Sequence, residues 1–341
     1  MKDYVNWEIL APGNIANSMA KAMSEMAKTH DSIHLYGIAS RSQVRAENFA
    51  KQWGFPKFFG SYQKLYEDPD VDAVYVANPH SLHYETVINL LEHNKHVLCE
   101  KPAGCNVDQL VDMMSLADEK NLFFMEALWT AYNPTLHKVR ECISKGKIGK
   151  LLNIDSNFCL RTVYNKDNRL WNPNLAGGAL LDLGIYNIFF SMMMNNFKGI
   201  ECFSSNARFR NNVDAWNSVT LNFSNKVTAS FQSSIDTTSD SETHDAVIYG
   251  TKGFITMKNF YKAQEAVIHK YTGEDGFDNE VLETISIPFE INGYEYELLD
   301  ATNNILQGKI ESKDYTRTDS IYLASVINDI RQQLNFKYPF E

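Results

Sequence analysis

The sequence predicts two domains in a chain of 341 residues: an α/β domain built on a doubly wound parallel sheet, followed by an α+β domain with a mostly antiparallel sheet. Two observations predict this. Over the first 125 residues, apolar strand-like runs alternate with stretches of helical periodicity, which is typical of a parallel sheet covered on both faces. After residue 150, β-like stretches follow one another with short polar links, and this indicates antiparallel pairing.

The first domain repeats a strand–helix unit. Its strand-like runs are apolar throughout, and its helical stretches carry apolar residues three and four positions apart, as Met19, Met23 and Met26 do. The expected strands cover residues 7–13, 32–40, 73–79, 96–102 and 122–128, and the expected helices cover 14–28, 42–54, 81–94 and 107–121.

The second half of the chain is β-rich, with one long apolar helix expected at 177–194 and a final helix at 320–334. Neither a low-complexity segment nor an internal repeat interrupts it. The β-like stretches are 150–161, 215–224, 226–235, 244–250 and 253–259.

The amino-acid composition indicates which classes of molecule the protein binds. The chain has 42 acidic and 32 basic residues, a net charge of −10 and no basic run, which argues against nucleic-acid binding. Its first ten residues lack the apolar stretch of a signal peptide, and no apolar run approaches the ~18–20 residues of a membrane helix. We therefore expect a cytoplasmic protein whose partners are small molecules and further copies of itself.

The cysteines and histidines show no metal-site spacing. The five cysteines include no C-x-x-C pair and are odd in number, so reduced, buried thiols are expected. No H-E-x-x-H or comparable set of ligands is present, and no metal is predicted.

A degenerate dinucleotide fingerprint follows the first expected strand. The stretch Ala11-Pro12-Gly13-Asn14-Ile15-Ala16 matches Gly-x-Gly-x-x-Ala, with alanine in place of the first glycine. Such a site needs a tight turn, a bare backbone at the second glycine and a helix N-terminus facing the pyrophosphate. A plain strand-to-helix turn is the alternative, and the surrounding strand–helix series favours the nucleotide site.

The end of the second strand bears on the choice of nucleotide. An NAD site usually has an acid there for the ribose hydroxyls, but this strand ends in Ser40, Arg41 and Ser42. A guanidinium with two hydroxyls suits the 2′-phosphate of NADP, because arginine binds phosphate through a planar fork. NADP is predicted, with NAD still possible, and an exposed helix start is the alternative interpretation.

Glu100, Lys101 and Pro102 stand at the end of the strand 96–102, in "HVLCEKPAG". With "VANPHSLHYE" (76–85), "MEALWTAYNP" (125–134), "AGGALLDLGIY" (176–186) and the closing "YPFE" (338–341), they resemble the Gfo/Idh/MocA family of oxidoreductases. The resemblance covers nearly the whole chain. It is strongest to the branch of dimeric dihydrodiol dehydrogenase and glucose-fructose oxidoreductase.

The resemblance implies an NADP-binding Rossmann domain over 1–125 and an open-faced α+β sheet domain for substrate binding and oligomerisation over 126–318. It also implies a C-terminal helical segment, 319–341, that returns to the Rossmann domain. Substrate would bind between the nicotinamide and the sheet. The exposed sheet would pair subunits into a homodimer or homotetramer.

The same resemblance carries roles onto three residues. Lys101 matches the motif lysine that contacts substrate and base, Tyr186 matches the proton-transfer residue of this branch, and Asp182 matches the acid one turn earlier. Four residues apart on a helix, Asp182 and Tyr186 should share a face. A free phenol has a pKa of ~10, and a neighbouring ammonium favours its phenolate form, so pairing Lys101 with Tyr186 is chemically reasonable.

Further site residues are predicted in addition to these three. Asn78, where the family often has threonine, and Pro79 end the strand before His80 and His83, and these four with Glu100 are expected to contact the cofactor. A water-facing helix start is the alternative for the two histidines. Arg161, Arg169 and Trp171 precede the apolar helix, and Arg169 and Trp171 are expected at the substrate.

These residues predict an NADP-dependent dehydrogenase or reductase that acts on a sugar, polyol or cyclic diol. Tyr186 would transfer the proton and Lys101 would assist it. One alternative is a non-catalytic NADP-binding regulator that engages a partner through its sheet. A family glycosidase is less favoured, because those members show a histidine-centred pattern where this chain has Gly-Ile-Tyr.

Overall fold

The computed structural model describes residues 2–237, 245–273 and 278–341. The chain divides into two compact units, each assembled from two segments. The first unit comprises Met1–Tyr132 and Glu290–Ala324, and the second comprises Asn133–Phe289 and Ser325–Glu341. The unit boundary lies inside helix α9 (Arg317–Gln333), so this helix contributes its first half to one unit and its second half to the other.

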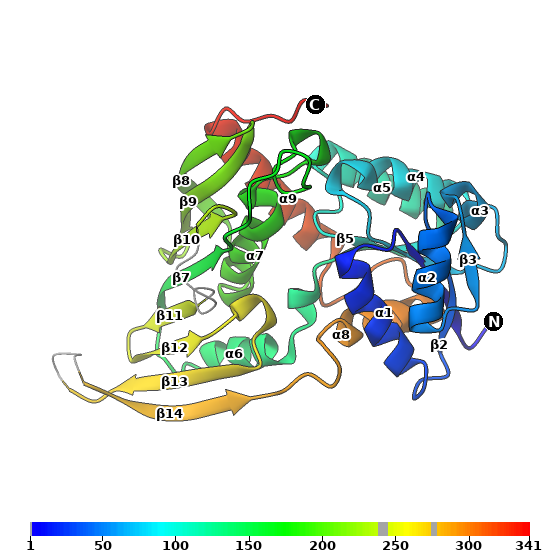
Figure 1. The fold of residues 1–341 in the computed structure, drawn as a ribbon. Coiled ribbons are helices and arrows are strands. Elements are labelled where there is room, and N and C mark those ends of the chain that lie inside the picture. The colour runs from blue at the N-terminus through cyan, green and yellow to red at the C-terminus, as the bar shows by residue number, and fades with distance from the viewer. Residues whose placement is uncertain (1, 238–244, 274–277) are drawn as a thin grey trace. The chain divides into compact units, whose positions relative to one another are not determined.

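The first unit is built on a six-stranded sheet in the order β3-β2-β1-β4-β5-β6 (Figure 1). Every neighbouring pair of strands is parallel. This confirms the predicted doubly wound sheet, because the order reverses between β1 and β4. The strands are β1 (Val5–Leu10), β2 (Ile33–Ala39), β3 (Lys57–Phe59), β4 (Ala73–Val76), β5 (His96–Glu100) and β6 (Phe124–Ala127).

Helices cover this sheet, and the chain's later segment supplies one that the sequence pattern did not single out. Helix α8 packs against α1 and β1, and the Trp7 indole on β1 donates a hydrogen bond of 3.0 Å to Thr302 Oγ1 on α8. The helices are α1 (Asn14–Met26), α2 (Gln43–Trp53), α3 (Tyr62–Tyr66), α4 (His83–Glu92), α5 (Val107–Lys120) and α8 (Glu295–Leu306).

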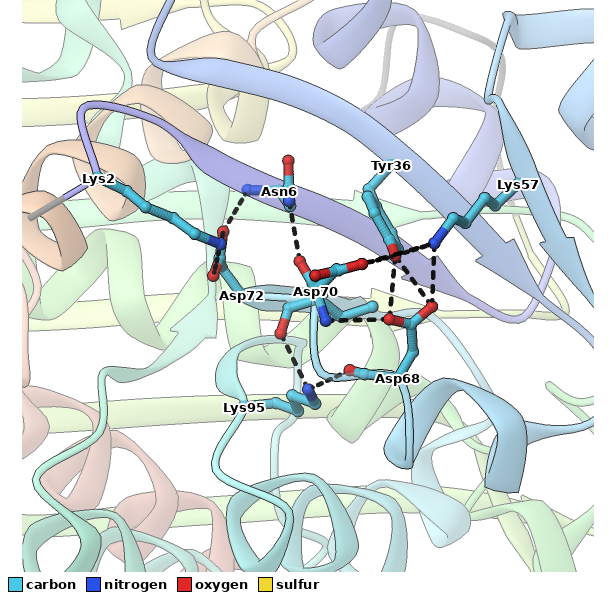
Figure 2. A network of polar contacts seen from close by, with 9 residues as sticks. Lys2, Asn6, Tyr36, Lys57, Asp68, Asp70, Asp72 and Lys95 are labelled. Atoms are coloured by element: carbon cyan, nitrogen blue, oxygen red, sulfur yellow. Dashed lines mark hydrogen bonds and ion pairs between the residues drawn. The ribbon is translucent and has the colours of Figure 1, made fainter.

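A polar network fastens the end of the sheet where strands β1, β4 and β5 begin (Figure 2). Lys2 pairs with Asp72 at 2.8 Å, and the Lys95 ammonium donates to the backbone oxygens of Asp68 and Val71. The Tyr36 hydroxyl donates to the Asp68 carboxylate at 2.9 Å. The network therefore lies away from the carboxyl ends of these strands, where ligands bind in such sheets.

The second unit contains an eight-stranded sheet in the order β14-β13-β12-β11-β7-β10-β9-β8 (Figure 1). Only the pair β7–β10 is parallel, which confirms the mostly antiparallel prediction. The strands are β7 (Leu151–Cys159), β8 (Ile200–Arg210), β9 (Val213–Phe223), β10 (Thr228–Ser234), β11 (Ala246–Gly250), β12 (Gly253–Met257), β13 (Glu265–Tyr271) and β14 (Asn279–Ser286).

Three strands lie outside the β-like stretches of the sequence: β8, β13 and β14. Strands β8 and β14 are the two edges of the sheet, and most of their residues are exposed or half-buried. An edge strand with two wet faces needs few apolar residues, so its sequence carries little strand signal. The predicted strand 244–250 is β11, although residue 244 lies outside the described residues.

One apolar helix crosses one face of this sheet. It opens with a π-helical turn (Leu180–Gly184) and continues as α7 (Ile185–Met194), and every residue of both is buried. The predicted helix at 177–194 is thus present, but its first turn is wider than an α-helical one. Residues 173–194 are long and apolar enough for a membrane span, yet 94% of that window is buried inside the protein, as in a core helix.

The thiols differ from expectation in one respect. The five cysteines form no disulfide with one another, and Cys99, Cys105 and Cys142 are buried. Cys159 is half-buried, whereas Cys202 is exposed because it lies on the edge strand β8. The prediction of buried thiols is therefore wrong for Cys202.

Candidate active site

The fingerprint turn joins β1 to α1. Ala11 adopts φ 76°, the left-handed conformation for which glycine is the usual residue, and its amide donates to Ala39 O at 2.9 Å. Gly13 is the N-cap of α1, which begins at Asn14. Alanine is therefore accommodated at the first position at some cost in backbone strain, about 1–2 kcal/mol.

Two features near the fingerprint turn, at the carboxyl ends of β1 and β4, fit a bound dinucleotide. A Cβ added at Gly13 would meet only Ala77 O, at 3.8 Å, so the protein's own packing leaves space above this residue. The Asn78 amide nitrogen donates to Thr86 Oγ1 at 2.8 Å, while its oxygen is buried without a hydrogen-bond partner among the described residues. A buried acceptor normally has a donor, so a ligand hydroxyl at this strand end would satisfy it.

The end of β2 offers one exposed cation. Arg41 is exposed, and its guanidinium lies close enough to Tyr62 to oppose the rise in the pKa of that phenol, which burial produces. The Ser40 hydroxyl accepts from Ser42 N at 3.2 Å, and the Ser42 hydroxyl caps α2. Both hydroxyls therefore shape the turn, and Arg41 is the residue of the predicted trio that faces water.

Arg45 was missed by the sequence analysis. It stands on the first turn of α2 and donates to Pro12 O at 3.0 Å, which ties α2 to the fingerprint turn. The contact joins positions 33 residues apart, and an arginine in the first turn of a helix looks like an ordinary surface residue in sequence.

Glu100 and Lys101 are both buried at the carboxyl end of β5. The Tyr75 hydroxyl donates to Glu100, and the other Glu100 oxygen accepts from Lys101 N at 3.2 Å. Burial and the Glu100 charge keep the pKa of Tyr75 well above its usual range, so this phenol stays a donor. The Lys101–Pro102 bond is cis. The two charges that interrupt an apolar strand in the sequence are thus held at the sheet edge.

The histidines after β4 are buried and are not a water-facing helix start. Pro79 caps a 3₁₀ turn, His80–Leu82, and α4 begins at His83. The His80 and His83 rings meet edge to face, with centroids 5.7 Å apart. His83 Nδ1 lies 2.8 Å from Pro102 O, and its Nε2 lies 2.8 Å from Asn78 O. These contacts join the end of β4 to the loop after Lys101.

In the second unit, Arg169 and Asp182 form an ion pair. The guanidinium contacts both carboxylate oxygens, at 2.8 and 3.4 Å, while the Arg169 side chain is 51% and that of Asp182 7% exposed. The structure thus brings together a predicted catalytic residue and a predicted substrate residue. Asp182 restrains Arg169, and Arg169 still presents about half of its side chain to solvent.

The π-helical turn that carries Asp182 begins at a double-glycine turn. Gly178 has φ 120°, and a Cβ there would lie 2.1 Å from Asp214 Oδ1. The other oxygen of Asp214 accepts from Leu180 N at 2.7 Å, which caps the turn, and burial raises the pKa of Asp214 to about 7. The Tyr338 hydroxyl, from the C-terminal segment, donates to Gly177 O at 2.7 Å. Distant parts of the unit therefore fix the start of this helix.

Tyr186 is buried at the start of α7, with 6% of its surface exposed. Its ring lies 5.6 Å from those of Phe158 and Tyr261, which stack on each other. The next residue, Asn187, accepts from Ser156 on β7 at 2.7 Å and donates to Ser233 on β10 at 3.2 Å. This amide anchors α7 to two strands, so Tyr186 has a rigid mount.

Trp171 is almost wholly buried, with 1% of its surface exposed. Its indole donates to Thr162 Oγ1 at 2.9 Å, and its carbonyl accepts from Asn211 at 2.7 Å. The Arg210 guanidinium lies 5.6 Å from the centroid of its ring. Trp171 therefore holds together the loop that also carries Arg169.

Within the described ranges, no group of three or more His, Cys, Asp or Glu side chains is arranged to hold a metal ion. Lys101 and the fingerprint turn belong to the first unit, and Asp182, Arg169 and Tyr186 belong to the second. Each unit thus supplies part of the predicted set of site residues.

Two known domain families match successive parts of the chain. The family described as "Oxidoreductase family, NAD-binding Rossmann fold" matches residues 9–128, and the GFO/IDH/MocA C-terminal domain matches residues 136–256. Trans-1,2-dihydrobenzene-1,2-diol dehydrogenase of Xenopus tropicalis is 31% identical over 337 residues, which cover 98% of this chain and 99% of that protein. The Mus musculus enzyme of the same name is 31% identical over 346 residues, which cover 98% of both chains.

Two solved structures share the fold at lower identity. A 3-ketoreductase from Actinomadura kijaniata in complex with NADP and TDP-benzene superposes with a TM-score of 0.84 at 23% identity, over 97% of this chain and 98% of that one. A levoglucosan dehydrogenase with NADH and L-sorbose gives 0.84 at 18% identity, over 98% and 97%. With matches along both domains and relatives that align from end to end, the chain belongs to the Gfo/Idh/MocA family of NAD(P)-binding oxidoreductases.

Proposed function

We propose that this protein is an NADP-dependent dehydrogenase or reductase that acts on a CH–OH group of a sugar, polyol or cyclic diol. The observation that carries the proposal is Lys101, a buried ammonium at the carboxyl end of β5, two strands from the fingerprint turn. Ligands of doubly wound sheets bind at this edge. The curated relatives act on a dihydrodiol, and solved relatives hold NADP or NADH.

Two residues carry the proton chemistry in this proposal. When bound, the nicotinamide cofactor supplies the hydride chemistry. In alcohol oxidation, Tyr186 accepts the proton of the substrate hydroxyl, and in ketone reduction it returns that proton. The ammonium of Lys101 favours the phenolate of Tyr186 and stabilises negative charge that develops on the substrate oxygen.

The remaining residues bind and orient. Gly13 and Asn78 fit the dinucleotide, Arg41 pairs with the 2′-phosphate, and Arg169, restrained by Asp182, contacts substrate hydroxyls. The choice of NADP in this proposal rests on Arg41, a water-facing guanidinium at the end of β2. The end of the second strand is where such domains bind the adenosine ribose.

The direct test measures NADP turnover with a panel of sugars, polyols and cyclic diols, followed by the absorbance of NADPH. On the best substrate, we expect Lys101→Met and Tyr186→Phe each to lower kcat by about 10²–10⁴-fold, the contribution of a positioned proton-transfer group. Lys64→Met, on the exposed face of α3, and Tyr4→Phe, a half-buried residue just before β1, are matched controls that should retain activity. Full activity in both site variants contradicts the mechanism, and tight NADP binding without any turnover favours a regulatory protein.

The cofactor preference has its own test. Arg41→Ala removes a charge-assisted contact worth about 1.5–3 kcal/mol, so kcat/KM for NADP should fall by roughly 10- to 100-fold. The value for NAD should stay within about twofold, because NAD lacks the phosphate that Arg41 binds. An equal loss for both cofactors would show that Arg41 has no part in the choice.

A further inference from the structure

The peptide group between Pro102 and Ala103 is held on both sides by buried side chains. Its carbonyl oxygen lies 2.8 Å from His83 Nδ1, and its N–H donates to Glu126 Oε1 at 2.8 Å. His83 has no exposed surface and Glu126 is 5% exposed. This peptide directly follows Lys101–Pro102, so whatever fixes it also fixes the backbone that aims Lys101.

The contacts of His83 determine its charge. Its second ring nitrogen, Nε2, lies 2.8 Å from Asn78 O. Both partners are backbone carbonyl oxygens, which accept hydrogen bonds and cannot donate them. A neutral imidazole carries one N–H, so it could satisfy only one of the two oxygens and would turn a lone pair toward the other. Both contacts are hydrogen bonds at the same time only when both nitrogens carry a proton, as they do in the imidazolium.

Glu126 presents the opposite charge to the other end of the peptide. Beyond the Ala103 amide, its Oε2 accepts from the Tyr315 hydroxyl and the Ser320 hydroxyl, each at 2.7 Å. Burial, and then the charge of Glu126, raise the pKa of Tyr315 well above its usual range, so the phenol remains a donor. Three donors on two oxygens are what a carboxylate accommodates.

We propose that His83 is a buried imidazolium and that, with the Glu126 carboxylate, it forms a positioning pair for Lys101. The cation lies at the carbonyl oxygen and the anion at the N–H of one peptide, so both charges align with the peptide dipole and both hydrogen bonds are charge-assisted. The effect on catalysis rests on the proposed function, whereas the charge state of His83 does not.

The charge state can be measured without activity. In the full chain labelled with ¹⁵N at histidine, the His83 ring should show a proton on both nitrogens at neutral pH, identified by the signals that vanish in His83→Gln. If that variant does not fold, the signals are assigned by substituting each of the other eight histidines instead. A single protonated ring nitrogen on His83 would overturn the proposal.

The positioning role is tested by kinetics in His83→Gln and Glu126→Gln. A small displacement of a catalytic group costs up to about 10²-fold, so kcat should fall by roughly 10- to 100-fold in both variants. In Glu126→Gln, which leaves the His83–Asn78 contact in place, the dissociation constant for NADP should stay within about twofold. His93 is the C-cap of α4, the helix that begins at His83. His93→Gln is therefore the matched control and should leave kcat unchanged.

A double-mutant cycle separates positioning from general damage. In a Lys101→Met background, His83→Gln should lower kcat by less than about twofold further, because the group it positions is already gone. A full additional loss would show that His83 acts elsewhere. Should Lys101→Met itself prove fully active, the proposed function fails, while a doubly protonated His83 would still stand.

Discussion

Glu8 carries a carboxyl group that is buried in the core of the first unit. It is fully buried on β1, and neither oxygen has a hydrogen-bond partner among the described residues. Burial raises its pKa well above the usual range, and the nearby Asp68 adds to the rise. The carboxyl carbon lies 3.3 Å from the place where a Cβ at Gly37 would be, so a larger residue in β2 would displace it.

The pH dependence of stability follows from this raised pKa. Because the folded pKa of Glu8 exceeds its unfolded value, the unfolded chain releases this proton first, and stability falls as pH rises between the two values. Glu8→Gln has the same shape and no proton to lose. We expect it to raise the free energy of unfolding by about 1–3 kcal/mol near pH 8 and by much less near pH 5.

Urea denaturation at both pH values measures this difference. Glu25→Gln, an exposed residue of α1 paired with Lys28, is the control and should show no comparable trend with pH. If the gain for Glu8→Gln were the same at both pH values, Glu8 would carry the same charge in the folded and in the unfolded chain.

At the scale of elements, the double-glycine turn decides where the Tyr186 helix begins. Gly178→Ala would place a Cβ 2.1 Å from Asp214 Oδ1 and would force alanine to φ 120°. We expect a loss of at least about 3 kcal/mol in stability, since a clash and a forbidden conformation combine. Gly146→Ala is the control, because its φ is also positive, 73°, but nothing lies within 4 Å of its Cβ.

The control should cost only about 1 kcal/mol. Thermal unfolding compares the stability of the two variants. The substrate KM provides a local measurement, because a displaced turn would move Asp182 and, with it, Arg169. Equal losses in the two variants would show that the contact with Asp214 is unimportant.

The C-terminal segment also holds the double-glycine turn in place. The Arg331 guanidinium pairs with the Glu341 carboxylate and lies 4.7 Å from the centroid of the Tyr338 ring. Tyr338→Phe keeps this packing and removes only the hydrogen bond to Gly177 O. We expect it to lower stability by about 1–2 kcal/mol, the cost of a buried carbonyl left without its donor. Tyr4→Phe, at a half-buried position just before β1, should change stability by less than about 0.5 kcal/mol in the same denaturation assay.

At the scale of the whole molecule, one face of the eight-stranded sheet is only half-buried. Strands β11 and β12 alternate buried and half-buried residues. The half-buried Tyr249 on β11, Phe254 on β12 and His269 on β13 bring their rings side by side. A broad aromatic face of this kind is typical of a contact between proteins.

We propose that two copies of the chain associate through this face. Sedimentation of the wild-type protein should show a dimer or tetramer, and Phe254→Lys should shift it toward the monomer, since a buried unpaired charge opposes association. Val44→Lys, on the exposed face of α2, should leave the assembly unchanged. A monomeric wild type at all concentrations would exclude this proposal.

The sequence by itself determined the parallel sheet of the first unit, the fingerprint turn, the charges at the end of β5 and the apolar helix of the second unit. Each of these depends on residues close together in the chain: continuous apolar strands, a strand followed directly by a helix, or a charge at a strand end. The family resemblance rests on the same local motifs.

Only the tertiary structure decided how these motifs are held. The Trp7–Thr302 contact joins residues 295 positions apart, Tyr315 reaches Glu126 across 189, and Tyr338 reaches Gly177 across 161. Other features likewise have no local sequence pattern: the edge strands β8 and β14, the π-helical turn, and the contacts of His83 and Glu126 with the Pro102–Ala103 peptide. Local periodicity reports which face of an element is buried, whereas the partner of each buried polar group is set by packing between distant segments.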